Sequence, residues 1–235
     1  MLQLIYRHNL FLLFIHIFTI SISAQVRNGS VEYGLIFAED KELENSVMAT
    51  YFAEAKKNAK YITFTLNFNK DEMCFFKNSI LNIDGVDTTF STVFSGVNGK
   101  TYRNRNSDII LNEQYNNNLG NIIVTNELKT NWTLTKETKL IDNYLCYKAT
   151  MTIDIVNSVG TFKRQIVAWY CPKIPVPFGP KGYGGLPGLI LELQEKGAVI
   201  GAKKISLNLK EIVIAKPIQG KFLTQKELND KIEKK

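Results

Sequence analysis

The chain has 235 residues, a net charge of +7 and 45% hydrophobic residues, enough for one sizeable domain or two small ones. It shows no low-complexity linker, charge break or internal repeat, so we expect one domain. The modest basic excess comes without any nucleic-acid-binding motif, which argues against a nucleic-acid partner.

The first 24 residues are predicted to form a secretory signal peptide. Arg7 is their only charged side chain, an apolar run follows over 10–18, and small residues precede Ala24. The alternative is a membrane anchor, but the run is shorter than the roughly 20 apolar residues that a spanning helix needs. We therefore expect cleavage near Ala24 and export of residues 25–235.

Export and cleavage determine the expected location, charge and chemistry of residues 25–235. The exported protein is predicted to reside in the periplasm, outside the cell or at the outer membrane, with no transmembrane segment. Loss of Arg7 lowers the net charge from +7 to +6. Both histidines, His8 and His16, are lost as well. That excludes serine–histidine and cysteine–histidine catalysis and histidine-based zinc motifs.

The remainder is predicted to be a single β-rich domain with its core at about 30–215. A strand is expected over 31–37, and Asp40 can cap a helix over about 41–58. Apolar residues recur at every fourth position of that helix: Leu43, Val47, Tyr51 and Ala55. Strict apolar–polar alternation predicts a half-buried strand over 61–69.

Several short alternating runs follow, separated by Asn, Gly and Asp. They span 72–76, 90–94, 107–112, 122–126 and 132–136. Many short strands at near-regular intervals indicate an antiparallel sheet. The pattern Thr224 to Glu227 is a capping box and predicts a short helix over about 225–234. The expected fold class is α+β, mostly β: a curved antiparallel sheet with one helix packed on a face and a short C-terminal helix.

A hairpin around 157–160 is the best-defined piece. If facing residues have numbers that sum to 317, one side pairs Tyr147 with Tyr170 and Ile155 with Phe162. The other face pairs Asp154 with Lys163 and Lys148 with Trp169, where a cation–π contact is expected. Arg164 is the one residue that does not suit its apolar face.

The same register places Cys146 opposite Cys171, on the more polar face. With a two-residue turn this is a non-hydrogen-bonded pair, whose Cα atoms lie within disulfide reach. With a four-residue loop a bridge is harder to form, so the sequence leaves both outcomes open. Cys74 is the odd thiol, and its apolar neighbours favour a buried side chain.

Residues 172–188 hold five of the six prolines and five of the fifteen glycines. Proline fixes φ and glycine permits angles closed to other residues, so this segment is a shaped loop. Its notable positions, with the strand residues before and after it, are Trp169, Tyr170, Pro175, Gly179, Pro180, Gly185, Leu186, Pro187, Gly188, Leu189 and Ile190.

These residues, with Trp132, Lys139 and Cys146, resemble the GLPGLI family of exported proteins of Gram-negative bacteria. The resemblance covers roughly 30–210 and is strongest over 132–193. It implies export and a mostly antiparallel β-fold, but no activity, cofactor or catalytic residue. Cys171 stands where the family is expected to have threonine or another small polar residue, so the resemblance does not imply a bridge.

Three functions follow from this reading. The first is a non-catalytic carrier whose curved sheet binds an apolar ligand, lined by Phe64, Phe68, Tyr147, Tyr170 and the loop; the same side chains could instead fill the core. The second is a protein-interaction or envelope-assembly module, in which the rigid loop is the contact surface. The third is a histidine-free hydrolase using Glu192 and Glu195. We expect no enzyme activity, no cofactor and no metal.

Overall fold

The computed structural model describes residue 26 and residues 28–79, 83–157 and 160–233. The predicted signal peptide, residues 1–24, lies outside the described residues and stays a prediction. Within the described part of the chain, no helix is long and apolar enough to cross a membrane.

A single twelve-stranded sheet forms the body of the molecule, in the order β12-β6-β5-β4-β3-β2-β1-β11-β10-β9-β8-β7. The strands are β1 (Asn28–Phe37), β2 (Thr63–Asn69), β3 (Glu72–Lys77), β4 (Lys100–Asn104), β5 (Ile109–Asn116), β6 (Gly120–Glu127), β7 (Thr133–Ile141), β8 (Tyr144–Asn157), β9 (Gly160–Cys171), β10 (Leu189–Glu195), β11 (Ala198–Leu207) and β12 (Lys221–Thr224). The helical segments are α2 (Lys41–Glu44), α3 (Ala49–Asn58), η1 (Ala59–Tyr61), α4 (Thr89–Ser95), η2 (Pro180–Gly182) and α5 (Gln225–Glu233).

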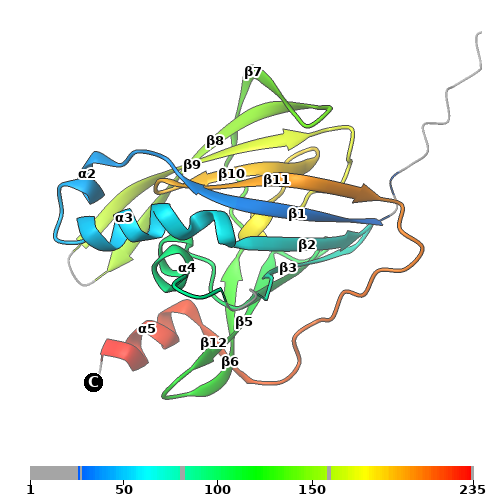
Figure 1. The fold of residues 1–235 in the computed structure, drawn as a ribbon. Coiled ribbons are helices and arrows are strands. Elements are labelled where there is room, and N and C mark those ends of the chain that lie inside the picture. Colours follow the sequence, from blue (N-terminus) through cyan, green and yellow to red (C-terminus); the bar gives the residue numbers. More distant parts are fainter. Residues whose placement is uncertain (1–25, 27, 80–82, 158–159, 234–235) are drawn as a thin grey trace, which may run out of the picture.

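The sheet is strongly bent. Figure 1 shows β1, β2, β10 and β11 running across the middle of the molecule, while β5, β6 and β12 lie below them and run steeply. This confirms the predicted mostly β fold class and the C-terminal helix. One pairing differs from expectation, because the edge strand β12 runs parallel to β6, with Lys221 to Thr224 beside Ile122 to Thr125. A long connection after β11 allows the chain to return in that direction.

The helix expected over 41–58 is two helices. Asp40 caps α2 as predicted, since its Oδ1 accepts from the backbone N–H groups of Glu42 and Leu43. The chain then leaves the helix at Asn45. The Ser46 hydroxyl bonds the backbone on both sides, a competition with helical bonding that favours turns. As a result Val47, predicted to lie on the buried stripe, is 95% exposed.

The strand expected over 90–94 is wrong, because this segment is the helix α4. Phe90 and Phe94 are four residues apart and lie on one helical side. Phe94 packs against Phe52 of α3, with ring centroids 5.3 Å apart, and Phe90 against Tyr51. A run of only five residues fits both the helical and the strand period of apolar residues, and the packing of α3 on α4 favours the helix here.

The hairpin register is confirmed along its whole length. Tyr147 faces Tyr170, Asp154 faces Lys163, and the series continues to Asn157 opposite Gly160. Lys148 lies over the Trp169 ring as expected, with Nζ 6.0 Å from the centroid. Lys139 of β7 lies closer to the same ring, at 4.5 Å.

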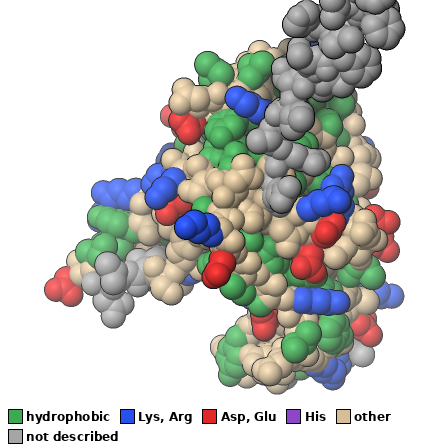
Figure 2. All heavy atoms as spheres, turned by 90° about the vertical axis from the view of Figure 1, so that its right-hand side faces the viewer, with side chains coloured by type: hydrophobic (Ala, Val, Ile, Leu, Met, Phe, Trp, Pro, Cys, Tyr) green, Lys and Arg blue, Asp and Glu red, His purple; other side chains and the backbone are tan. Residues whose placement is uncertain are grey.

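The main hydrophobic cluster lies inside the bend of the sheet. It joins side chains of the central strands to the first half of the 172–188 loop, including Tyr33, Phe64, Phe68, Phe75, Ile174, Val176 and Phe178. A second cluster packs against the other side of β8 and β9 and takes in Leu186. On the face drawn in Figure 2, basic and acidic side chains are intermingled rather than gathered into a patch of one sign.

Candidate functional site

The proline- and glycine-rich loop fills the concave side of the sheet. Ile174, Val176 and Phe178 alternate with prolines, and these three side chains are at most 2% exposed. The backbone is also tied to β10, because the N–H groups of Leu189 and Ile190 donate to the carbonyls of Ile174 and Phe178, each at 2.9 Å. This part of the loop therefore belongs to the hydrophobic core.

Arg103 of β4 holds the middle of the loop. Its Nη1 donates to the carbonyl of Pro177 at 2.7 Å, and its guanidinium carbon lies 5.3 Å from the centroid of the Phe178 ring. Burial lowers the pKa of Arg103 to about 10, against the opposing charge of Asp108, so the group stays charged at neutral pH. A Cβ at Gly184 would lie 2.1 Å from that Nη1, which explains the glycine there.

The second half of the loop turns toward β7 and β8. The Trp132 indole N–H donates to the Gly184 carbonyl at 2.9 Å, and Leu186 is buried in the second cluster. Of the predicted loop positions, Gly179, Pro180, Leu186, Gly188, Leu189 and Ile190 are buried, whereas Pro175, Gly185 and Pro187 are exposed. Trp169 is half-buried, and Tyr170 is buried at the end of β9.

The predicted apolar-ligand surface is packed by the protein itself. Phe64 and Phe68 are fully buried in the main cluster beside the loop. Tyr147 and Tyr170 face each other in the second cluster, with ring centroids 6.0 Å apart. The four residues therefore do not line one surface, and Ile174, Val176 and Phe178 pack in the same cluster as Phe64 and Phe68.

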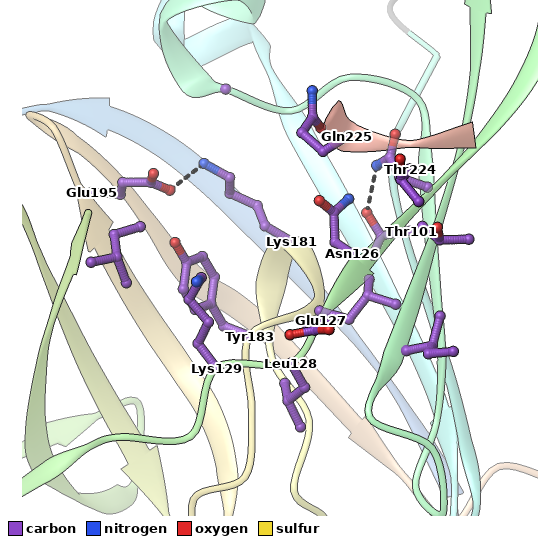
Figure 3. A pocket seen from close by; sticks show the side chains of 16 residues that line it. Thr101, Asn126, Glu127, Leu128, Lys129, Lys181, Tyr183, Glu195, Thr224 and Gln225 are labelled. Carbon is purple, nitrogen blue, oxygen red and sulfur yellow. Dashed lines mark hydrogen bonds and ion pairs between the residues drawn. The ribbon is translucent and has the colours of Figure 1, made fainter. Parts of the chain in front are cut away.

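A groove of about 730 Å³ opens instead between β5–β6 on one side and β10 with the second half of the loop on the other. Its apolar lining comes from Ile109, Ile110, Leu128 and Ile153. Its polar lining comes from Thr101, Asn112, Thr125, Asn126, Glu127, Lys129, Lys181, Tyr183, Glu195, Thr224 and Gln225. Figure 3 shows Lys181, Tyr183 and Glu195 on one wall and Asn126, Thr224 and Gln225 on the other.

Glu195 is the electrostatic centre of this groove. Its carboxylate bonds Arg164 Nη1 at 2.9 Å and Lys181 Nζ at 2.5 Å, and all three side chains are largely buried. Burial alone raises the pKa of Glu195, but Lys181 and Arg164 outweigh it and leave that pKa below its usual range. Burial, and then the Glu195 charge, raise the pKa of Tyr183. Arg164 therefore has a partner that the hairpin register alone could not reveal.

Three polar side chains in the groove make no hydrogen bond or ion pair with the other described residues: Asn126, Glu127 and Lys129. All three follow Thr125, the last residue of β6 that pairs with β12. They are available to a ligand, whereas Lys181 and Arg164 already share the carboxylate of Glu195.

The two glutamates considered for hydrolysis do not form a pair. Glu192 and Glu195 are three residues apart on β10, so they point to opposite faces of the sheet. Glu192 bonds Lys139 at 2.7 Å, away from the groove. Within the described residues, no group of three or more His, Cys, Asp or Glu side chains could hold a metal ion.

Cys146 and Cys171 directly follow the last pair of the β8–β9 ladder and are free thiols; the register had left a bridge between them open, and the polar surroundings expected for them are wrong. Both thiols are 0% exposed and lie in the main cluster, since the loop covers the face that was expected to be polar. Cys74 is a third buried thiol on β3, as predicted.

Comparison with known proteins adds two findings. Residues 156–192, which include the hexapeptide Gly185 to Ile190, match the model of a family described as "Protein of unknown function (Porph_ging)". Two solved structures of PNGF-II, in space groups P21 and C2, are similar in fold, with TM-scores of 0.55 and 0.51 at 19% and 17% identity. They cover 88% of this chain, which in turn spans about a third (33% and 32%) of each PNGF-II chain. No curated protein matched.

Proposed function

We propose that this chain is an exported, non-catalytic binding module of the cell envelope and a member of the GLPGLI family, and that its ligand is a polypeptide segment bound in the groove. The match over 156–192 supports the family assignment, because it includes the hexapeptide for which that family is named. The leader-like pattern of residues 1–24 supports export.

The lining of the groove is the observation on which the ligand class rests. Ile109, Ile110 and Ile153 can take apolar side chains, while the free amide of Asn126 can bond a peptide backbone. Ligand pockets typically combine such apolar surface with a few polar groups, at 300–1,000 Å³. An acyl chain needs an apolar interior, and the loop fills that space with Ile174, Val176 and Phe178.

A non-catalytic role is supported by the chemistry available. Residues 25–235 contain no histidine. The best-placed carboxylate, Glu195, is tied to two cations and has a lowered pKa, which makes it a poor proton acceptor near neutral pH.

The test is native mass spectrometry of the full chain, expressed with its leader and purified from its own envelope. We expect a stoichiometric bound peptide or protein, lost in Asn126→Arg, which places a long cation in the groove. Asn118→Arg, on the exposed turn between β5 and β6, adds the same charge elsewhere and should retain it. A bound lipid of fixed mass, or a bound species that Asn126→Arg does not displace, would contradict the proposal.

A further inference from the structure

We infer that Cys146 and Cys171 form a cross-strand disulfide that fastens the base of the proline- and glycine-rich loop to β8. This inference is independent of the groove and its ligand. It rests on the proposed export only for the state of the two thiols inside the cell.

The sheet geometry brings the two residues together. The ladder of β8 and β9 runs without a register shift from Asn157 opposite Gly160 to Tyr147 opposite Tyr170, and the cysteines are the next pair. Because hydrogen-bonded and non-hydrogen-bonded pairs alternate along the ladder from Asn157 opposite Gly160, the cysteines form a non-hydrogen-bonded pair. Its Cα atoms are then about 4.5 Å apart, at the short end of the separation that a disulfide spans.

The two thiols already interact. The contact between them is the main cause that lowers the pKa of Cys171 and raises that of Cys146. The nearby backbone of Lys173 and Ile174 lowers the pKa of Cys171 further, while the Cys146 thiol donates to the Tyr144 carbonyl at 3.5 Å. Cys171 is therefore the sulfur that becomes a thiolate first.

The third cysteine cannot compete. Four strands separate β3, which carries Cys74, from β9 in the sheet. Burial raises the pKa of Cys74 to about 11, so its thiol is also unreactive at neutral pH. Cys74 is thus a matched buried control for the other two.

The oxidation is an ordinary thiol–disulfide exchange with an external disulfide. The Cys171 thiolate attacks that disulfide, forms a mixed disulfide and releases the first thiolate. The Cys146 thiolate then attacks the Cys171 sulfur and releases the second. The protein loses two protons and two electrons, and the external disulfide becomes two thiols. In the envelope the oxidant would be a disulfide-exchange protein, and in vitro oxidised glutathione serves.

Burial determines when this exchange can occur. Both thiols are 0% exposed beneath Ile174 and its neighbours, so an external disulfide cannot reach them in the folded protein. The bond must form before the loop closes over the strands. The reduced, folded protein is therefore expected to oxidise far more slowly than a chain that is refolding.

The experiment has two arms, read by alkylation of free thiols and peptide mapping. In the first, the reduced full chain is refolded from urea with oxidised and reduced glutathione. We expect a Cys146–Cys171 linked peptide, a mass lower by two hydrogen atoms, and alkylation at Cys74 alone. A bond that includes Cys74, or alkylation at all three cysteines, would overturn the inference.

The second arm maps the protein purified from the envelope. A linked peptide is expected there as well, whereas free thiols there after success in the first arm would contradict export rather than the pairing.

The stability of the folded protein provides a separate test of the disulfide. Reduction should lower the urea midpoint of the wild type and of Cys74→Ser, but not that of Cys146→Ser. Equal shifts in all three proteins would overturn the inference.

Discussion

The two sides of the proline- and glycine-rich loop differ in what occupies the space beside them. On the side of β1 to β4, Ile174, Val176 and Phe178 pack into the hydrophobic cluster inside the bend of the sheet. On the side of β5, β6 and β10, the groove remains open and is lined by polar as well as apolar side chains. The difference shows that one rigid segment can close an apolar interior and at the same time form the wall of an open groove.

The largest effect is expected on the filled side. Phe178→Ala removes a fully buried ring that also contacts Arg103, and should lower the free energy of unfolding by about 4 kcal/mol. The matched change Phe162→Ala removes a ring that is 50% exposed and should cost under about 1 kcal/mol. Urea denaturation measures both, and equal losses would contradict a filled interior.

Gly184→Ala should be the next most severe change, at about 3 kcal/mol. The new methyl group would lie 2.1 Å from Arg103 Nη1 and 2.2 Å from the Pro177 carbonyl oxygen. Gly201→Ala is the control, because its Cβ would meet nothing closer than Glu192 at 3.8 Å. If thermal unfolding shifts equally in both variants, Arg103 does not hold the loop as described.

The ion pairs at the groove predict a pH dependence. The folded pKa of Glu195 lies below the unfolded value, so its stabilisation is present above the unfolded pKa of about 4.3 and is lost as pH falls through the folded pKa. Glu195→Gln should cost about 2 kcal/mol at pH 7 and make stability less dependent on pH below about 5. An unchanged slope of stability against pH would show that Glu195 is not held by Lys181 and Arg164.

The smallest effect on folding is expected in the open part of the groove. Asn126→Arg should change the free energy of unfolding by less than about 0.5 kcal/mol, because the amide makes no side-chain hydrogen bond with the other described residues. Circular dichroism melts of this variant and of Asn118→Arg should coincide. A large loss in Asn126→Arg alone would mean that Asn126 is part of the core.

The sequence was sufficient where a pattern is local. The alternation over 61–69 predicted β2, the sum rule predicted the β8–β9 register, and the pattern from Thr224 to Glu227 predicted the cap of α5, where each residue bonds the other's backbone. Each of these rests on neighbours within a few residues or on two strands joined by a tight turn, so no distant contact can change the result.

Prediction failed where distant segments decide the structure. The segment 90–94 is helical because α3 supplies Phe52 as a packing partner. Arg164 is tolerated because Glu195, on β10, pairs with its guanidinium. The alternation of Ile174, Val176 and Phe178 was visible in the sequence and could have indicated a buried extended segment, but only the bend of the sheet shows what that segment fills.

Fragment binding followed by two-dimensional ¹H–¹⁵N NMR tests most directly whether the groove, rather than the interior of the sheet, receives ligands. A library of small amides and apolar fragments is added to the exported protein, and the shifted backbone amides are mapped. We expect the shifts to centre on Asn126, Lys129 and Tyr183 and to vanish in Asn126→Arg. Shifts centred on Phe64, Phe68 and Phe178 would mean that the interior opens to ligands, and would contradict this account.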